Sequence, residues 1–429
     1  MMKFKKIKLS IEKPKAKDWL FILFLAMCFF IPHTKFSVPA MGRYELTIAD
    51  IILMILTSLT IYLNKGIRKS FFPFFAILIL LTFICFFSIA MILEFDRYLL
   101  SMIPFLFSLL ISFTTLSFFS QGNIVRRMKI FRNILFINLT LSILPVYHQF
   151  ITGTKTVLFY DLYGWRYAFL AQNPNQYGVC FIVFFFLITL ITIKMFPKDL
   201  GKLLIFEVFF FLPALFSGSK STTLVFTVNY LLLMFYYFFQ ANYSRKVIFL
   251  FSFFIIVGLG YKPVVDNVLS KGAQINRALS IFESISKPKE FEIGGGSGHS
   301  IKQAQILFWR YPLLGVGMGN KPPYAKGLGP KPGLEIHNTF LLFLAESGIL
   351  GFSAFFLLFA LAPIYTLFSK SSSQFKFIML VIFALFAAQN VVGMLFRQRW
   401  VWLFLCIAFI LANVDSQGNY QRSKLRILN

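Results

Sequence analysis

The chain has 429 residues, of which 58% are hydrophobic and 19% aromatic, and it carries a formal net charge of +26. Apolar runs of about 20 residues recur along most of its length, which is typical of a polytopic helical membrane protein and excludes an ordinary soluble domain. An outer-membrane barrel is disfavoured as well, because it would show short alternating strands.

Residues 1–18 form a basic segment in front of the first apolar run. No cleavage site of small residues follows that run, so we expect a retained cytoplasmic tail that leads into a signal-anchor helix. The four cysteines all lie inside apolar runs and show neither a CxxC nor a Cys/His spacing. They predict neither disulfides nor a zinc site, and no cofactor is expected.

Twelve apolar segments follow the tail, and they predict an all-α membrane protein with about 12 transmembrane helices. Helices 1–9 fall within 19–261, and helices 10–12 fall within 339–413. The segments lie at about 19–32, 44–63, 71–93, 98–119, 134–152, 176–195, 203–217, 221–240, 247–261, 339–369, 376–393 and 400–413. Three of them, the seventh, ninth and twelfth, are short for a full span.

The distribution of Lys and Arg predicts the orientation of these helices. Loops such as "NKGIRKS", "SQGNIVRRMKIFRN" and "ANYSRK" are basic, whereas "EFDR" after the third helix is net acidic. By the positive-inside rule the basic loops face the cytoplasm, and so do both termini, including the tail 414–429. The segment 262–338 then lies outside as one long periplasmic loop, because long loops are exempt from the rule.

The periplasmic loop contains one stretch of helical character, "SIKQAQILFWRYP", between Gly-rich and Pro-rich sequences. Ile301, Gln305 and Phe308 share one stripe of this stretch, and Trp309 suits a membrane interface. We predict a short helix that lies on the outer surface.

The first polar motif, "GWRYAFLAQNPNQYG", lies just outside the sixth apolar segment. Asn173 and Asn175 flank Pro174, a pattern that suits a helix cap with Pro in the first turn as well as it suits a binding site. Arg166 is matched to bidentate binding of phosphate oxygens, although an interfacial Arg often only anchors on lipid headgroups.

The second motif, "LPALFSGSKSTTLVF", is a tight outer turn between the seventh and eighth segments. Lys220 must lie near the outer membrane plane, because a Lys at the bilayer centre costs about 2.5–3.5 kcal/mol. Ser217, Ser219 and Ser221 are candidates to cap the eighth helix, whose positive dipole end would then lie beside Lys220. The turn therefore predicts a binding site for a diphosphate. The alternative is an ordinary turn in which the Lys220 side chain extends toward the membrane surface.

The third motif reads "YPLLGVGMGNKPPYAKGLGPKPGLEIHNTF" and begins with three alternating glycines, Gly315, Gly317 and Gly319. They superficially suggest a nucleotide-binding loop, but the strand and helix of a soluble βαβ unit are missing. We interpret the glycines as positions where the backbone passes close to helix ends or to a glycan.

The same motif ends with His337 and Asn338 at the entry to the tenth helix. A neutral imidazole there can accept a proton from an attacking hydroxyl near neutral pH. A lone His is more often structural. The predicted topology places Arg166, Lys220 and Asn338 on the same face of the membrane as His337, which favours a functional interpretation.

Glu346 suggests a His-Glu dyad, which helical geometry disfavours. Nine residues at about 100° each place it roughly opposite His337 and more than about 10 Å along the axis. We expect Glu346 to bond another helix or a polar group within the bundle. Gly348 and Gly351 are expected to permit close helix packing.

The order of these motifs resembles that of the O-antigen ligase and O-antigen polymerase superfamily. The shared pattern is Arg-x6-Asn-Pro-Asn, then Ser-Gly-Ser-basic, then Pro-Leu-x-Gly-Val-Gly-x-Gly-Asn, and finally His-Asn followed by Glu-x-Gly-x-x-Gly. The resemblance spans about Gly164 to Phe352 and is most specific from Pro312 to Gly351. The first four helices match only in hydropathy.

The resemblance implies an enzyme of the bacterial inner membrane that transfers a glycan from undecaprenyl diphosphate to an acceptor sugar on the periplasmic side. It implies an inverting, metal-independent glycosyltransferase in which His337 acts as base on the acceptor hydroxyl. By position, Lys220 takes the place of an Arg, although Lys cannot bind two phosphate oxygens as a rigid fork. Asn173, Asn175, Asn338 and Ser219 would support the substrate.

The sequence departs from the family where a Gly-Arg is expected before the surface helix. His299 stands near the expected Arg, with Lys302 close by. The second diphosphate ligand therefore has several candidates, which include Lys302, Arg310 and Arg277. Tyr160, Trp165, Tyr167 and Tyr324 are candidates to stack on sugar faces, or ordinary interfacial aromatics.

Two acceptors agree with the resemblance. An O-antigen ligase uses the lipid A core in lipopolysaccharide biosynthesis, whereas a polymerase of O-antigen or exopolysaccharide uses a second lipid-linked repeat; we favour the ligase on the general motif pattern. A twelve-helix transporter or flippase is the alternative of another class. It would carry charged or broken helices near the midplane, whereas Asp50 and Glu207 lie within about two turns of a predicted helix end.

Overall fold

The computed structural model describes residues 16–34, 37–41, 44–63, 65–152, 154, 157–159, 167–171, 174–217, 219–240, 297–326, 328, 338–391 and 398–414. The predicted ninth helix, most of the periplasmic loop and nearly all of both tails lie outside these residues. Arg166, Asn173, Arg277 and His337 lie outside them as well.

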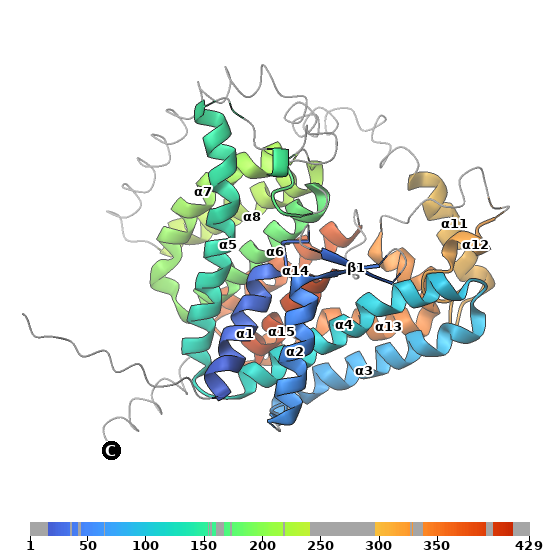
Figure 1. The fold of residues 1–429 in the computed structure, drawn as a ribbon. Coiled ribbons are helices and arrows are strands. Elements are labelled where there is room, and N and C mark those ends of the chain that lie inside the picture. Colours follow the sequence, from blue (N-terminus) through green and yellow to red (C-terminus); the bar gives the residue numbers. More distant parts are fainter. Residues whose placement is uncertain are drawn as a thin grey trace, which may run out of the picture.

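Every predicted apolar segment except the ninth coincides with a helix in the described residues (Figure 1). The helices are α1 (Ala16–Phe30), α2 (Ile48–Tyr62), α3 (Phe72–Phe87), α4 (Phe95–Ser120), α5 (Ile124–Thr152), α6 (Pro174–Met195), α7 (Leu200–Phe216), α8 (Lys220–Gln240), α13 (Thr339–Phe368), α14 (Ser373–Val391) and α15 (Arg399–Asn413). The all-α membrane architecture is therefore confirmed, because apolar runs satisfy their backbone groups internally as helices.

Seven of the described helical stretches are long and apolar enough to cross a membrane. They are Lys69–Met91, Phe95–Ser120, Ile124–Gln149, Asn175–Met195, Ser221–Phe239, Thr339–Phe368 and Ser373–Asn390. Three further apolar helices, Trp19–Phe30, Ile48–Tyr62 and Arg399–Asn413, are shorter. The number of twelve spans, their orientation and the division into tails and loops stay predictions.

A β-hairpin replaces the start of the predicted second helix. Strand β1 (Ser37–Met41) pairs antiparallel with β2 (Tyr44–Thr47), and the register places Ser37 opposite Thr47. The helix begins only at Ile48, because Thr47 and Asp50 form a reciprocal capping box at that point. The prediction of helix from residue 44 is wrong by four residues, since hydropathy alone does not detect a strand that has found a partner.

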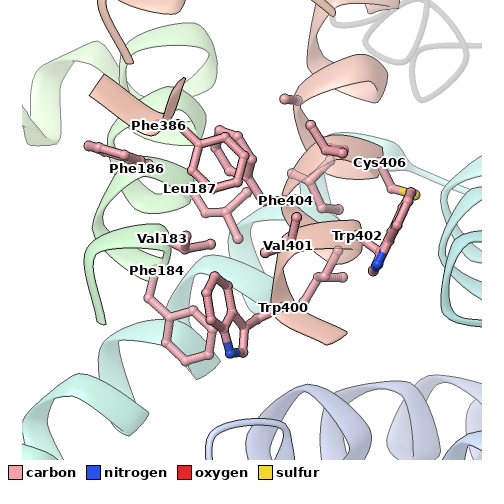
Figure 2. Packing of buried hydrophobic residues seen from close by; sticks show 14 of the residues in the cluster. Val183, Phe184, Phe186, Leu187, Phe386, Trp400, Val401, Trp402, Phe404 and Cys406 are labelled. Carbon is pink, nitrogen blue, oxygen red and sulfur yellow. The ribbon is translucent and has the colours of Figure 1, made fainter. Parts of the chain in front are cut away.

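The centre of the bundle is built from α6, α14 and α15 (Figure 2). Every residue of α6 from Tyr177 to Lys194 is buried, and so is α15 from Trp400 to Ala412. The Phe404 ring lies 4.6 Å from the Phe386 ring of α14, measured between centroids. These helices are apolar because they form the protein core, and the short α15 is surrounded by other helices.

Asp50, in the first turn of α2, is a structural group. It is fully buried and forms an ion pair with Arg399 at the start of α15. The pair joins the first turn of α2 to the first turn of the last helix. The Asp50 carboxylate is thus neutralised by the Arg399 guanidinium and also caps α2. This agrees with the predicted position of Asp50 near a helix end.

Candidate active site

The glycine motif of the long loop is bound to a break in α13. Gly348 adopts a left-handed conformation, with φ +63°, inside the helix Thr339–Phe368. The break removes the two hydrogen bonds that Ile349 and Leu350 would donate to Ala345 and Glu346 in a regular helix. Both sets of backbone groups therefore need other partners.

The loop supplies those partners by a reciprocal exchange. The amides of Val316 and Gly317 donate to the carbonyls of Ala345 (2.9 Å) and Glu346 (3.0 Å). In return, the amide of Ile349 donates to the Pro312 carbonyl at 2.8 Å, and the amide of Leu350 to that of Leu313 at 3.4 Å. Four loop-to-helix bonds thus replace two helical ones. We call this arrangement, formed by residues 312–317 and 345–350, the glycine clamp.

The glycine clamp explains the alternating glycines. Gly315, Gly317 and Gly319 all have positive φ, and a Cβ on Gly315 would meet the Glu346–Ser347 backbone. A Cβ on Gly348 would collide with the Leu313 carbonyl. The expectation of close backbone approach to a helix is confirmed. Gly348, however, breaks its helix and packs on a loop, in contrast to the helix–helix contact expected for it.

A second anchor lies directly after the glycines. The Asn320 side-chain oxygen accepts from the amides of Leu93 (3.0 Å) and Glu94 (2.8 Å), in the turn before α4. The Tyr324 hydroxyl of α12 (Lys321–Tyr324) donates to the Met91 carbonyl of the same turn. Burial raises the pKa of the Tyr324 hydroxyl, so it remains a proton donor at neutral pH. The loop is thereby fixed to two separate parts of the bundle.

Glu346 is buried beside the glycine clamp, and its carbonyl accepts the Gly317 amide. This position agrees with the expectation that Glu346 lies within the bundle, and the expectation that it does not pair with His337 stays a prediction. His337 itself lies outside the described residues. Asn338, the next residue, caps α13, since its side-chain oxygen accepts from the Leu341 amide at 3.0 Å. Asn338 thus has a capping role, and its proposed part in substrate binding stays a prediction.

The Ser-Gly-Ser-Lys turn is a buried network of hydroxyls between α7 and α8. Ser217 and Ser219 are buried, and the Ser219 amide donates to the Ser217 hydroxyl at 3.3 Å. The Thr222 hydroxyl donates to the Ser219 hydroxyl at 2.9 Å, and the Thr223 amide donates to the Ser219 carbonyl at 3.0 Å. Ser219 therefore precedes the first turn of α8, as expected. Lys220 begins the helix, and its side chain lies outside the description.

The same turn meets the first turns of α6 and the end of α14. A Cβ on Gly178 would collide with the Thr222 hydroxyl, so α6 and α8 approach closely there. Gln389 of α14 donates from its side chain to the Ser221 hydroxyl at 3.1 Å. Asn175, three residues before Gly178, is exposed. The structure thus brings the Asn-Pro-Asn and Ser-Gly-Ser-Lys motifs together, and it adds Gln389, which the sequence reasoning missed.

The segment that follows Arg166 is held deep against α5. Tyr167 is fully buried, and its hydroxyl donates to the Ser142 carbonyl. Phe169 adopts a left-handed φ of 48°, and its ring stacks on Phe159. Tyr167 is therefore an anchor for the backbone next to Arg166 and not a surface on which a sugar can stack.

His33 packs against the same segment. Its ring lies 5.6 Å from that of Phe169, and its Nε2 forms a 3.1 Å hydrogen bond with the Asn138 side chain. Burial lowers the pKa of His33 to about 4 and outweighs the opposing effect of the Asn138 hydrogen bond. His33 is therefore neutral at physiological pH.

The surface helix of the outer loop is present as α11 (Ser297–Arg310), which confirms the predicted helix. Its buried residues are Ser300, Gln303, Ala304 and Leu307. Of the stripe noted in the sequence, Ile301 and Phe308 are half-buried and Gln305 is exposed. Small and amide side chains allow α11 to pack closely on α13.

The structure does not bring every residue predicted to bind diphosphate to one place. Lys302 and Arg310 are exposed on α11, and the side chain of His299 on the same helix lies outside the description. The glycine clamp and the serine turn are linked through α14 and α15, which pack on α13 as well as on α6. Asn320 and Gln389 join the site region without having been predicted. The sequence contained a signal for each: Asn320 directly follows Gly317-Met318-Gly319, and Gln389 forms an amide pair with Asn390 near the end of a helix.

The comparisons with known proteins add one finding. A sequence profile described as O-Antigen ligase matches residues 205–356, from within α7 to just beyond the glycine clamp. No curated protein matches the chain. The matched segment contains Lys220, the loop glycines and the His337–Asn338 pair, whereas Arg166 lies upstream of it.

The match confirms the resemblance that the motifs predict. It implies glycan transfer of the ligase or polymerase type by a glycosyltransferase-like enzyme that acts on lipid-linked glycans. Together with the apolar helices it indicates a multi-pass membrane protein. Over residues 205–356, from within α7 into α13, the chain is similar to the O-antigen ligase family.

Proposed function

We propose that this protein transfers a glycan from undecaprenyl diphosphate to an acceptor sugar on the periplasmic side of the bacterial inner membrane, as an O-antigen ligase that uses the lipid A core. The observation that carries the proposal is the glycine clamp, which lies within the family match and holds the loop next to the start of α13. That helix begins one residue after Asn338, so the loop that contains His337 ends at a fixed point.

His337 is the general base of the proposed reaction. Its neutral imidazole accepts the proton of an acceptor hydroxyl while the hydroxyl oxygen forms a bond to the anomeric carbon of the donor sugar. The bond from that carbon to the diphosphate oxygen breaks with its electron pair, and polyprenyl diphosphate leaves as an anion. Attack from the side opposite the leaving group inverts the anomeric configuration. No metal ion takes part in this proposal.

The leaving diphosphate needs fixed positive charge outside the membrane. Lys220 at the N-terminus of α8 supplies a point charge, and the first amides of the helix add the positive end of the dipole. Arg166 is the proposed bidentate partner, since a Lys cannot act as a rigid fork. Its neighbour Tyr167 is fixed to α5, so the chain has a defined anchor directly after Arg166.

Asn175 and Ser219 support the donor in this proposal, because the motifs that contain them meet where Gly178 contacts Thr222. Lys302, Arg310 and His299 are the less favoured diphosphate ligands, since the first two lie on the exposed side of α11. A polymerase that uses a second lipid-linked repeat agrees equally with the family match and is the second candidate function.

One reconstitution experiment tests the proposal. The purified protein is placed in vesicles with a labelled lipid-linked repeat and either lipid A core or additional donor. A ligase is expected to label the lipid A core, whereas a polymerase is expected to extend the lipid-linked repeat. If neither acceptor is extended by correctly folded protein, the proposed glycan transfer is wrong.

The base assignment is tested with His337→Ala. We expect normal insertion and melting temperature but a loss of transfer of about 100-fold or more, as for a general base. His148→Ala is the matched control, because His148 is exposed near the end of α5. A His337→Ala enzyme with wild-type rates would refute the assignment.

A further inference from the structure

The outward side of α11 combines two cations with exposed apolar side chains. Lys302, Gln305, Ile306, Trp309 and Arg310 are all exposed, and Trp309 keeps 77% of its surface accessible. At 100° per residue these five positions occupy an arc of about 140° on the helix, opposite the buried Gln303, Ala304 and Leu307. We call these five residues the α11 outer face. Exposed apolar area of this kind marks an interaction surface.

The orientation of this face is fixed. The Lys321 ammonium of α12 is buried and donates to the Gln303 side chain at 2.7 Å, on the packed side of α11. Ala304 and Leu307 are buried on the same side, and α11 packs on α13. Figure 1 shows α11 and α12 at the end of the bundle that α3, α4 and α13 reach. The α11 outer face therefore has one direction relative to the membrane-spanning helices.

Further apolar side chains are exposed at the end of α11 and on α13, the helix on which it packs. Leu313, just after α11, is 64% exposed, and its carbonyl accepts the Leu350 amide of α13. Ile349 and Leu350 are themselves exposed on α13, a helix apolar enough to cross the membrane. Exposed apolar side chains therefore lie on Leu313 and on α13 as well as on the α11 outer face.

The charge of the face selects its partner. Ser297–Arg310 contains no acidic residue, and among the described residues no ion pair engages Lys302 or Arg310. Cations at the edges of an apolar stripe with Trp are the composition of a helix that lies in the headgroup layer. Phosphate groups of anionic phospholipids complement both charges.

We propose that the α11 outer face docks on anionic phospholipids of the outer leaflet. Ile306 and Trp309 enter the boundary between headgroups and acyl chains, while Lys302 and Arg310 bind lipid phosphates. The face thereby fixes the depth of the loop that leads into the glycine clamp. This inference is independent of the proposed transfer reaction, and it gives the two cations a role other than binding of the donor diphosphate.

The proposal is tested with a fluorophore on Gln305→Cys in the full-length protein, in nanodiscs of zwitterionic and anionic phospholipid. The four native cysteines are buried, so labelling is selective for the new position. Bromine near the head of the acyl chain is placed on one lipid or on the other, and quenching reports which lipid lies beside the face. The discs contain no polyprenyl lipid, so donor binding does not contribute.

Brominated anionic lipid is expected to quench more strongly, with a relative association constant raised about fivefold per cation. The double variant K302Q/R310Q should bring that ratio to about one. Lys326→Gln is the matched control, because Lys326 is an exposed cation outside α11 whose ammonium lies 3.7 Å from the Glu94 carboxylate. It should leave the ratio unchanged.

Three outcomes would overturn the proposal. Absence of quenching by either lipid would show that the face lies in water. Equal quenching by the two lipids when Lys302 and Arg310 are both present would show that these cations have no role in lipid binding. Protection of the fluorophore only in discs that contain two protein copies would make the face a contact between copies of the chain.

Discussion

The two motifs inside the family match are attached to the bundle by opposite means. The loop motif is held by backbone groups: the glycine clamp uses four amide-to-carbonyl bonds, and no side chain of residues 312–317 takes part in them. The serine turn is held by side chains, since the hydroxyls of Ser217, Ser219 and Thr222 form its connections. The first attachment requires that Cβ atoms be absent, and the second requires that hydroxyl groups be present.

This difference predicts how each motif responds to substitution. Adding a methyl group at a clamp glycine introduces a collision together with an unfavourable φ, whereas removing a hydroxyl from the serine turn loses one modest bond. Both attachments position a segment near the proposed site. They should therefore differ more in the stability that they contribute than in their influence on transfer.

The largest effect is expected for Gly348→Ala. The residue has φ +63°, and a Cβ would meet the Leu313 carbonyl, so the substitution should cost about 3 kcal/mol or more. The measurement is the melting temperature of the purified protein in detergent. Gly66→Ala is the control, because its Cβ meets nothing within 4 Å. Equal melting temperatures for the two variants would refute the glycine clamp as a stabilising element.

His33 provides a third attachment, of the segment at Phe169, and its imidazole can titrate. The stability that it contributes should therefore depend on pH, unlike that of the other two attachments. The pKa of His33 is lowered to about 4, whereas that of an unfolded His is about 6.5, so only the unfolded state binds a proton between these values. The contribution is complete above about pH 6.5 and is lost as the pH falls toward 4, by up to about 3 kcal/mol. Melting temperatures measured across this range should fall with decreasing pH, and His33→Gln should reduce the slope. An unchanged slope in His33→Gln would contradict this role.

Asn320→Ala tests the side-chain anchor within the otherwise backbone-held loop. Two amides, of Leu93 and Glu94, would lose their acceptor, at a cost of about 2 kcal/mol. Asn320→Asp keeps the acceptor oxygen and is expected to restore part of the loss in melting temperature. If both variants melt like wild type, the loop does not depend on this anchor.

The smallest effect is expected for Thr222→Val, which removes one hydroxyl from the serine turn with little change in shape. The cost should be about 1 kcal/mol, because the Ser219 hydroxyl loses a donor. In the transfer assay KM for the lipid-linked donor should rise while kcat changes little, since Lys220 follows Ser219 directly. Thr222→Ser retains the hydroxyl and should behave like wild type. A larger effect on kcat than on KM would contradict this assignment.

Hydropathy predicted the helices well. It failed for segments whose conformation or packed side depends on contacts with another part of the chain. The segments that became α4, α6 and α13 are long and apolar, so their backbone has few alternatives to a helix in a membrane. The hairpin of β1 and β2 was not predicted, because a strand is stable only with its partner. The packed side of α11 was not predicted either: it contains Gln303 and Ala304, which are buried, and Gln303 accepts a hydrogen bond from Lys321.

The candidate site was predicted as a set of motifs and not as an arrangement. Their residue types indicated diphosphate chemistry, but nothing in the spacing showed that Gly178 contacts Thr222 or that Gln389 reaches Ser221. Such contacts join helices far apart in the sequence, and local propensity contains no information about them. The positions proposed for Arg166, His337 and the Lys220 ammonium stay predictions.

The sequence by itself determined that the chain is helical and apolar and that its motifs resemble those of O-antigen ligases, because periodic composition and short motifs are local properties. Only the tertiary structure decided what the glycines do. A left-handed residue in α13 exposes amides and carbonyls that must find partners, and the loop provides them through its own backbone. Backbone amides and carbonyls are nearly the same in every residue. The glycines in the sequence therefore indicate where a loop can approach a helix closely, but not which helix it binds.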